Sequence, residues 1–419
     1  MNTAITAPAL PSEIRAARGL DIARAKGKRI KHVTAEVYLC PSQTASGGYV
    51  VDLAEGSCTC EDFETTGERC KHAWAVLIAR GAVTVEGEAL RADEPRKTYS
   101  QDWPAYNRAQ CEEKERVQIL LRGLCDGIVQ PAAKRTGRPA ARLDDVIYGA
   151  AMKVYTTMSG RRATTDLREC EARGYVDHAP AYNTLFKFME RPELKPLLTA
   201  LVEESAAPLR AVETALAADA TGFATSTYAC WFDHKYGQDK RVQRWVKAHA
   251  MVGTKTHVIT AVTVTEGHEN DCPQFATLLD ATTAKGWRPA EVSADKAYLS
   301  NDNLAAIEAA GAVPYIPFKS NSSPTGNTEA WQRLYHHFAG HRREFLAAYH
   351  KRSNVESVFS AVKRKFGGSV RSKLPAAQFN EVLLKCLCFN LSMLVHAIHE
   401  LGVEPTFWMP ETAAMAVAS

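Results

Sequence analysis

The sequence predicts an α/β protein, in which a mixed β-sheet covered by helices on both faces is preceded by a helical region and a small cysteine-rich module. The sheet is predicted by short alternating apolar runs that follow one another after residue 212 and are separated by helix-like segments. The module is predicted by two closely spaced groups of Cys and His residues before residue 75. At 419 residues, the chain is long enough for two or three domains.

Composition indicates a soluble protein of a reducing compartment. Hydrophobic residues make up 46% of the chain, and the most apolar run, residues 376–401, is interrupted by polar residues, which predicts a buried helix rather than a membrane span. No secretion signal is evident, so the cytoplasm is the default location. The eleven cysteines are an odd number with few close neighbours, which argues against a disulfide framework.

The net charge of +4 is too small to identify a partner, but the positive residues are clustered. Four stretches are locally basic, namely residues 15–31, 134–142, 235–247 and 351–373. Such clusters are expected where a protein follows phosphates.

Residues 1–100 are predicted to form the cysteine-rich module. Strands are expected at 33–39 and 48–53, and a helix at 73–79. Between them lies a C-x-C-x9-C-x-H pattern, filled by Cys58, Cys60, Cys70 and His72. Three thiolates and one imidazole complete a tetrahedral zinc site with no open position, so we expect one structural zinc ion that supplies much of the folding free energy. The alternative is chance spacing, which the two tight groups disfavour.

Residues 101–210 are predicted to be helical and connective. A helix at 111–126 is followed by a basic linker at 128–141, whose Gly137-Arg138-Pro139 triplet only weakly matches a minor-groove hook and favours a plain linker. Three short helices are expected at 143–157, 161–173 and 181–189. They form either a structural bundle or a helix-turn-helix-like unit that contacts phosphates, and the sequence leaves both open. The cations available to such a unit are Arg161, Arg162, Arg168 and Lys187.

From residue 212 the predicted order is three strands, a helix, a strand, a helix, a strand and further helices. The strands are expected at 214–225, 241–252, 255–264, 290–294 and 313–318, with helices at 272–283 and 301–310. Asp219 follows the apolar approach of the first strand, and Asp295 comes directly after the fourth. Either acid alone could end a strand or cap a turn.

Residues 349–363 are predicted to form one helix, because they contain neither Gly nor Pro. At about 100° per residue, Tyr349, Arg352, Glu356 and Lys363 fall within an arc of roughly 60°. Such a stripe is often only a solvated face. Here the remaining positions include apolar residues, so the helix can pack on a core while presenting a carboxylate between cations.

The three carboxylates of Asp219, Asp295 and Glu356 indicate a metal site if they converge. They would repel one another in a partly buried site unless divalent cations neutralised them, and carboxylate oxygens favour Mg²⁺ or Mn²⁺. Two such ions, about 3.5 to 4 Å apart, can activate the attacking oxygen and stabilise the leaving oxygen of a phosphodiester. The neighbouring cations would hold phosphate oxygens.

These motifs resemble those of the DDE transposases of bacterial insertion sequences, whose catalytic core is ribonuclease H-like. The resemblance covers residues 211–402 and is carried by a Y-x2-R-x3-E-x6-K signature and two acidic motifs, namely Tyr349, Arg352, Glu356 and Lys363 with Ala218-Asp219-Ala220-Thr221-Gly222 and Ala294-Asp295-Lys296-Ala297-Tyr298. It implies that Asp219, Asp295 and Glu356 bind two Mg²⁺ or Mn²⁺ ions. It also implies that Tyr349, Arg352 and Lys363 contact DNA. Only 60 residues separate Asp295 from Glu356, which leaves little room for the large inserted domain of some relatives.

The amino-terminal pattern closely resembles a SWIM-type zinc finger, whose usual partner is DNA or protein. The matching stretches are Cys60-Glu61-Asp62-Phe63 and Cys70-Lys71-His72-Ala73. The resulting division is a zinc-finger module at 1–100, a helical region at 101–210, a catalytic domain at 211–402 and a tail at 403–419.

The implied activity is cleavage at the ends of a transposable element, followed by attack of the freed 3′-hydroxyl on target DNA. The implied partners are double-stranded DNA, as element ends and as target, and a homodimer or larger assembly that holds two ends, with no membrane. The implied location is the bacterial cytoplasm at the nucleoid. Two alternatives stay open: a nuclease or resolvase that does not join DNA, and a domesticated zinc-finger protein without catalysis.

Overall fold

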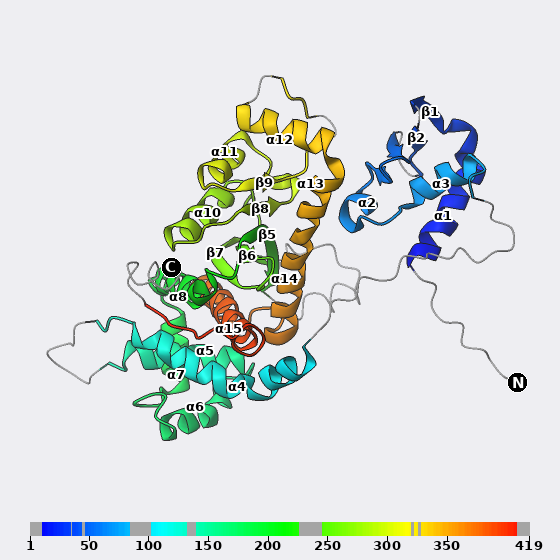
Figure 1. Ribbon diagram of the computed structural model, residues 1–419. Helices are drawn as coiled ribbons and strands as arrows, with labels where there is room; N and C mark the ends of the chain where they lie inside the picture. The colour runs from blue at the N-terminus through cyan, green and yellow to red at the C-terminus, as the bar shows by residue number, and fades with distance from the viewer. Residues whose placement is uncertain are drawn as a thin grey trace, which may run out of the picture. The chain divides into compact units, whose positions relative to one another are not determined.

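The computed structural model describes residues 11–34, 36–43, 47–83, 102–131, 140–225, 245–319, 322–325 and 328–408 (Figure 1). The chain divides into two compact units. The first comprises residues 1–100 with 337–350, and the second comprises residues 101–336 with 351–419. The predicted helical region and the predicted sheet therefore belong to one unit.

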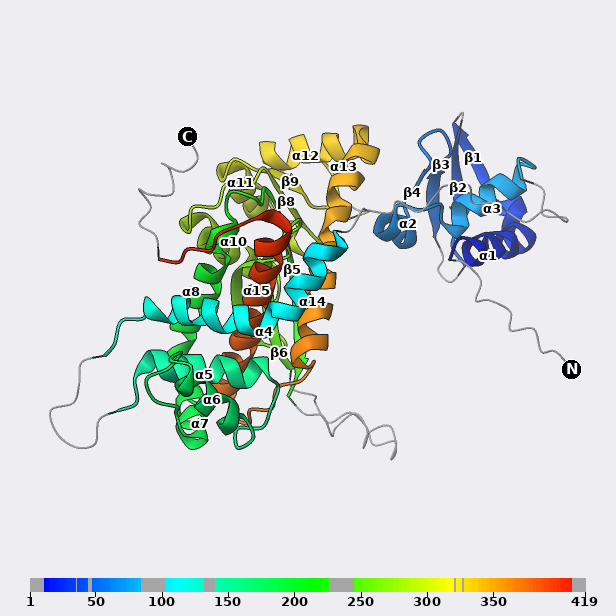
Figure 2. The same ribbon diagram turned by 60° about the horizontal axis from the view of Figure 1, so that its bottom comes forward.

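The first unit contains a four-stranded antiparallel sheet in the order β1-β2-β3-β4 (Figure 2). Its elements are α1 (Pro11–Lys26), η1 (Gly27–Arg29), β1 (Lys31–Thr34), β2 (Val37–Pro41), β3 (Gly48–Asp52), β4 (Ser57–Cys58), α2 (Glu61–Thr66) and α3 (Lys71–Ala79). The expected strand at 33–39 is wrong in its extent, because β1 ends and β2 begins within it. Helix α1 packs closely on α3, since a Cβ atom at Gly19 would lie 2.5 Å from Cβ of Trp74.

The second unit begins with helices that were predicted in part. They are α4 (Trp103–Asp126), α5 (Leu143–Tyr155), α6 (Ala163–Ala172), α7 (Tyr182–Met189), α8 (Leu194–Ala206) and the short η2 (Ala207–Leu209). Helix α4 starts eight residues before its predicted start, because the Asp102 carboxylate caps it by accepting a bond from the Ala105 amide. Helix α8 was not predicted. The Gly137-Arg138-Pro139 triplet lies outside the described residues.

A five-stranded mixed sheet forms the centre of the second unit and confirms the predicted fold class. Its strands are β5 (Ala215–Ala224), β6 (Trp245–Gly253), β7 (Ile259–Glu266), β8 (Glu291–Ala294) and β9 (Val313–Tyr315), in the order β7-β6-β5-β8-β9. Strands β5, β6 and β7 pair antiparallel, whereas β8 pairs parallel with β5 and β9. Residues 241–244 of the expected second strand lie outside the described residues.

Helices cover both faces of this sheet (Figure 1). They are α8, α10 (Gln274–Ala284), α11 (Asn301–Ala309), α14 (Ser353–Phe366) and α15 (Pro375–Leu401). The 3₁₀ turn η3 (Lys296–Tyr298) follows β8, and α12 (Glu329–Gly340) follows β9 in the chain. Thr282 of α10 contacts Thr260 of β7 through their hydroxyls, whereas Asn390 of α15 binds the backbone of the adjacent Ile259. Strand β7 lies at the edge of the sheet, so the Asn390 side chain satisfies backbone groups at that edge.

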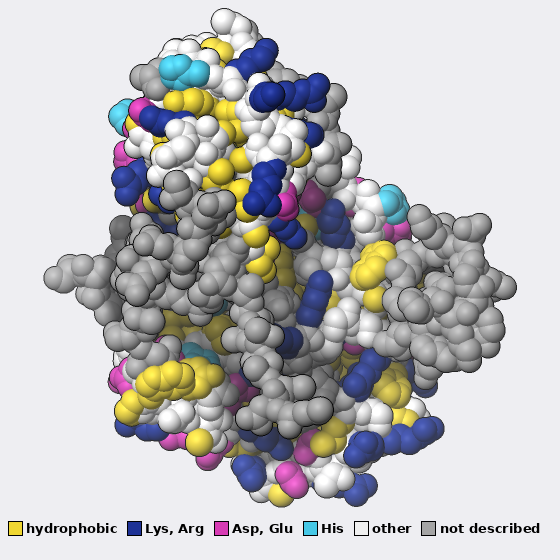
Figure 3. Space-filling model, turned by 90° about the vertical axis from the view of Figure 1, so that its right-hand side faces the viewer, with side chains coloured by type: hydrophobic (Ala, Val, Ile, Leu, Met, Phe, Trp, Pro, Cys, Tyr) yellow, Lys and Arg dark blue, Asp and Glu magenta, His cyan; other side chains and the backbone are white. Residues whose placement is uncertain are grey.

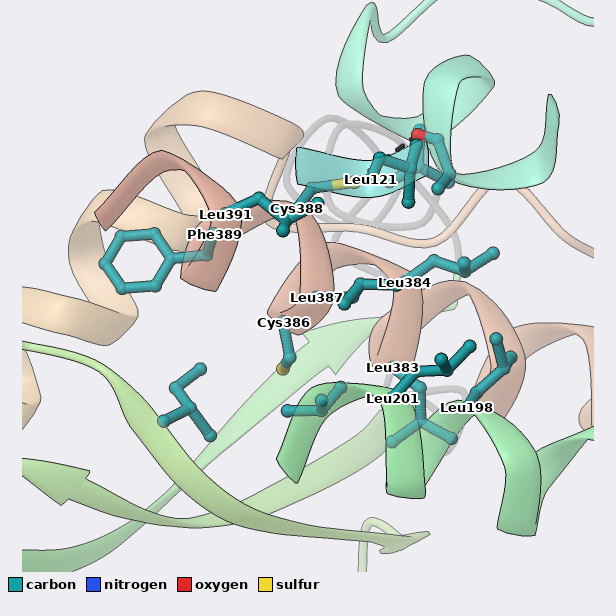
Figure 4. Close-up of a cluster of buried hydrophobic side chains, with 14 of the residues drawn as sticks. Leu121, Leu198, Leu201, Leu383, Leu384, Cys386, Leu387, Cys388, Phe389 and Leu391 are labelled. Atoms are coloured by element: carbon teal, nitrogen blue, oxygen red, sulfur yellow. Dashed lines mark hydrogen bonds between the residues drawn. The ribbon is translucent and has the colours of Figure 1, made fainter. Parts of the chain in front are cut away.

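Helix α15 is the central core helix of the second unit. By length and composition it could cross a membrane, but 78% of its most apolar window is buried inside the protein. Figure 4 shows its leucines among those of α4 and α8, such as Leu121 and Leu198. The Asn390 amide also donates to the Val202 carbonyl, so this polar side chain is fully satisfied within the core. The predicted buried helix is confirmed.

Candidate active site and zinc site

The parallel pairing of β5 and β8 brings two of the predicted acids to neighbouring strands. Ala218 pairs with Ala294, and Asp219 and Asp295 are the residues that directly follow this pair in the chain. Asp219 lies within β5, whereas Asp295 follows the end of β8 and caps η3 by accepting a bond from the Ala297 amide at 2.6 Å. Two acids that are 76 positions apart in the sequence therefore lie at one level of the sheet.

Arg352 connects the strand acid Asp219 to the helix acid Glu356. Its guanidinium donates to Asp219 Oδ2 at 2.9 Å and to Glu356 Oε1 at 2.8 Å. The side chain of Arg352 is only 16% exposed, so water screens these charges less than at an open surface. Just after it, the Asn354 amide donates to the Thr254 carbonyl at 2.7 Å and fastens the start of α14 to the turn between β6 and β7.

The electrostatics of Asp219 show that the three acids influence one another. Burial raises the pKa of Asp219, and the charges of Asp295 and Glu356 raise it further, while Arg352 and the Ala220 amide oppose this shift. Burial is the largest cause of the raised pKa, and Arg352 opposes it more strongly than either neighbouring acid adds to it. The carboxylate oxygens of the three acids are the hard donors that a divalent cation prefers. In the described part of the chain, however, the ligand atoms that lie within 4.8 Å of one another are those of Cys58, Cys60, Cys70 and His72, so the three acids are neighbours without being gathered around one ion position.

Two other residues of the predicted signature behave differently. Lys363 lies two turns after Glu356 on α14, with its ammonium 5.6 Å from the ring centre of Phe223, and burial lowers its pKa. Tyr349 is the last residue of α13 (Arg342–Tyr349) and belongs to the first unit.

The prediction of one continuous helix over residues 349–363 is wrong at its start. The 3₁₀ turn η4 (His350–Arg352) separates α13 from α14. A 3₁₀ turn advances by about 120° per residue, so the predicted α-helical stripe does not extend to Tyr349.

The predicted zinc ligands lie together in the first unit. Cys58 is the last residue of β4, Cys60 and Cys70 directly precede α2 and α3, and His72 lies in the first turn of α3. All four side chains are buried, and their ligand atoms lie within 4.8 Å of one another. Bonds from the thiols of Cys58 and Cys60, together with the backbone amides of Ala73 and His72, lower the pKa of Cys70 to about 3. Thiolate is the form that binds metal, so this donor set fits zinc.

The sequence did not indicate a group of polar residues around Asp271. Two groups lie close to Oδ1 of Asp271: the ammonium of Lys247 at 2.5 Å and Nδ1 of His249 at 3.3 Å. Burial lowers the pKa of His249 to about 4. Burial raises the pKa of Tyr298, and the charges of Asp271, Asp219 and Asp295 add to the shift, which places this buried phenol near both groups. Only the basic stretch containing Lys247 could have pointed here, because Asp271 lies in a loop that folding brings to β6.

Residues 210–391 match the family model of the transposase DDE domain. This domain defines an enzyme class that acts on DNA with divalent metal ions. Residues 49–81 match the model of the SWIM zinc finger, which implies zinc. The chain therefore carries a transposase DDE domain and an amino-terminal SWIM zinc finger, as the sequence predicted.

Proposed function

We propose that this protein binds the ends of an insertion sequence, cleaves them and joins their 3′ ends to target DNA. The observation that supports this best is the cluster of three acids, in which Arg352 links Asp219 to Glu356 while Asp295 lies beside Asp219 on the next strand. The full set of acids and cations also argues against a domesticated protein without catalysis, which would have no reason to keep it.

In this proposal Asp219, Asp295 and Glu356 hold two Mg²⁺ or Mn²⁺ ions. When bound, such a pair supplies Lewis acidity on both sides of a phosphodiester and makes an in-line displacement possible. Arg352 donates to an oxygen of Asp219 and to one of Glu356, so it competes for two of the oxygens that would bind metal. If these carboxylate oxygens bound metal, the guanidinium could instead donate to a DNA phosphate.

The other signature residues would position DNA. Lys363 lies two turns after Glu356 on α14 and is only partly buried, which suits a contact with a backbone phosphate. Tyr349 would contribute a phenol to the same DNA or orient a water molecule. Lys and Arg side chains recur over the face of the protein shown in Figure 3, as expected for a protein that follows phosphates.

The first prediction tests the three acids. The changes Asp219→Asn, Asp295→Asn and Glu356→Gln keep side-chain volume and remove metal-binding charge, so each should abolish end cleavage and strand transfer while end binding persists. The losses should be non-additive, because a site lacking one ligand has already lost its geometry. Should Asp219→Asn or Glu356→Gln cleave ends near the unmutated rate in Mg²⁺, this assignment of the site is wrong.

A second measurement separates the transposase from the rival nuclease or resolvase. Labelled element ends are incubated with a target plasmid, and the products are resolved by size. Joined products support the proposal, and cleavage without joining supports the rival. Inverted repeats flanking the coding region would supply the end sequences.

The proposal extends to the assembly and to the zinc finger. Synapsis of two ends requires at least a homodimer, and the substrates place the protein at the nucleoid of a bacterial cytoplasm. The SWIM finger would hold one structural zinc ion and contribute a contact to DNA or to a protein.

A further inference from the structure

A groove with a volume of about 440 Å³ runs along α14 and is separate from the acids. Three residues of α14 that line it, Ser357, Ala361 and Arg364, follow Glu356 by roughly 80 to 140° around the helix axis. Its other walls come from α4, α15 and the turn between β6 and β7. The helix that carries Glu356 therefore presents a second surface, which the proposed chemistry does not use.

The turn that forms one wall is held rigidly. The buried carboxylate of Glu213 accepts bonds from the amides of Lys255 and Thr256 at 2.9 and 2.8 Å. A Cβ atom at Gly253 would lie 2.5 Å from Oε2 of the same carboxylate, so only glycine fits there. Within this turn His257 has φ of 60°, in the left-handed region that non-glycine residues rarely adopt. Such strained residues gather at binding sites, where the surrounding structure enforces them.

Two exposed cations line the groove without a partner. Among the residues that the structure describes, neither the ammonium of Lys255 nor the guanidinium of Arg364 has an ion pair or a hydrogen bond. The adjacent Lys365, in contrast, is bound to Glu113 at 2.5 Å. The one acid of the groove, Glu400, accepts from His396 at 3.1 Å, which also contacts Gln110. The groove therefore presents unsatisfied positive charge.

The rest of the lining is apolar and aromatic. Val358 and Phe389 form buried floor positions, and the ring of Tyr106 lines the groove from α4. The volume lies within the range of small-ligand pockets, about 300 to 1,000 Å³, and is too small for a duplex. An aromatic ring beside cations is how proteins hold single strands, because the ring stacks on a base while the cations follow the backbone.

We propose that this groove binds a single DNA strand, with its phosphates at Lys255 and Arg364 and one base against Tyr106. The occupant would be the strand left unpaired at a cleaved element end, held on the helix that carries Glu356. This inference rests on the proposed function for the source of the strand.

The test compares a blunt end duplex with the same duplex carrying a short single-stranded overhang. Binding is measured by fluorescence anisotropy over a range of salt concentrations, in the Glu356→Gln background so that cleavage does not intervene. The parent should prefer the overhang. The double change Lys255→Ala with Arg364→Ala should remove that preference and lower the salt slope on overhang DNA by about 1.4, the value for two single-strand phosphates. Tyr106→Leu should weaken overhang binding about tenfold and leave blunt binding unchanged.

The matched control is Arg333→Ala, which removes an exposed arginine that is already paired with Glu308 and Glu329. It should leave preference and slope unchanged. Equal losses on blunt and overhang DNA would overturn the single-strand assignment, and so would a double variant that keeps the preference. A fall in oligomer mass with unchanged DNA binding would make the groove a protein interface and also overturn it. If the alanine variant does not fold, the double change Lys255→Gln with Arg364→Gln removes the same two charges and is measured in the same way. Because this experiment measures binding and no cleavage, its failure is distinct from failure of the transposase proposal.

Discussion

Arg352 is the residue that most directly links folding to the proposed chemistry. It reaches two carboxylates at once because its donors are spread over a planar fork, whereas an ammonium is a single point of charge. A lysine at this position keeps the charge and cannot hold both acids in the same way.

We therefore predict that Arg352→Lys lowers end cleavage at least tenfold with little change in melting temperature. Cleavage of labelled ends and thermal unfolding followed by circular dichroism are the two measurements. Lys351→Arg, a change at an exposed neighbour paired with Glu291, serves as control and should cleave normally. An unfolded Arg352→Lys protein would mean that this side chain serves the fold instead.

Asp219 is expected to destabilise the metal-free protein. Because its pKa is raised in the folded state, the folded protein binds this proton more tightly than the unfolded chain. Stability is therefore lost as pH rises from the ordinary value of 3.8 through the raised one, and at neutral pH the charge is a cost.

We predict that Asp219→Asn raises the melting temperature in EDTA at pH 7 by up to about 2 °C, the shift that about 1 kcal/mol gives in a domain of about 250 residues or more. The gain should disappear at pH 3, where the native carboxyl is protonated. Asp280→Asn, at an exposed site on α10, is the control and should change neither value. A lower melting temperature for Asp219→Asn at pH 7 would show that its bond to Arg352 outweighs burial and repulsion.

At the scale of elements, the sequence predicted segments better than junctions. The strands of the central sheet were found because alternation of apolar residues is a local signal. The break between α13 and α14 was missed, because Asn354 is tied to the Thr254 carbonyl, a contact 100 positions away in the sequence. The first turns of α4, which begins at Trp103 after its cap Asp102, were not predicted although a capping residue is present. Helix α8 lies in the part of the chain that was predicted to be helical and connective without a helix of its own.

The zinc finger is an element whose ligands were predictable, since their spacing alone marks them. We predict that Cys58→Ser and Cys70→Ser in the full chain each remove the bound zinc and unfold the first unit, while the second unit still unfolds at its normal temperature. Zinc content by mass spectrometry and hydrogen exchange of each unit are the measurements. Cys111→Ser, at an exposed thiol on α4, should keep one zinc per chain. Absence of zinc from the unmutated protein would refute the site.

At the scale of the whole molecule, the sequence identifies the three candidate acids but not the residues that surround them in the folded protein. The motifs carrying Asp219, Asp295 and Glu356 can be read from short stretches. The group of Lys247, His249 and Asp271 forms only when the loop after β7 comes back to β6. The groove beside α14 likewise combines four separate parts of the chain, none of which carries a recognisable motif.

The long separations within the acid cluster also bear on when this protein first becomes able to cut. Asp219 and Arg352 are 133 positions apart, and β6, β7 and α10 lie between β5 and β8 in the described part of the chain. Contacts of this kind form late and slowly, because a long loop must close before they stabilise anything. A chain still emerging from the ribosome has no assembled acid cluster until α14 has been made and has docked. A potentially mutagenic enzyme of the kind we propose would therefore be harmless as a nascent or truncated fragment.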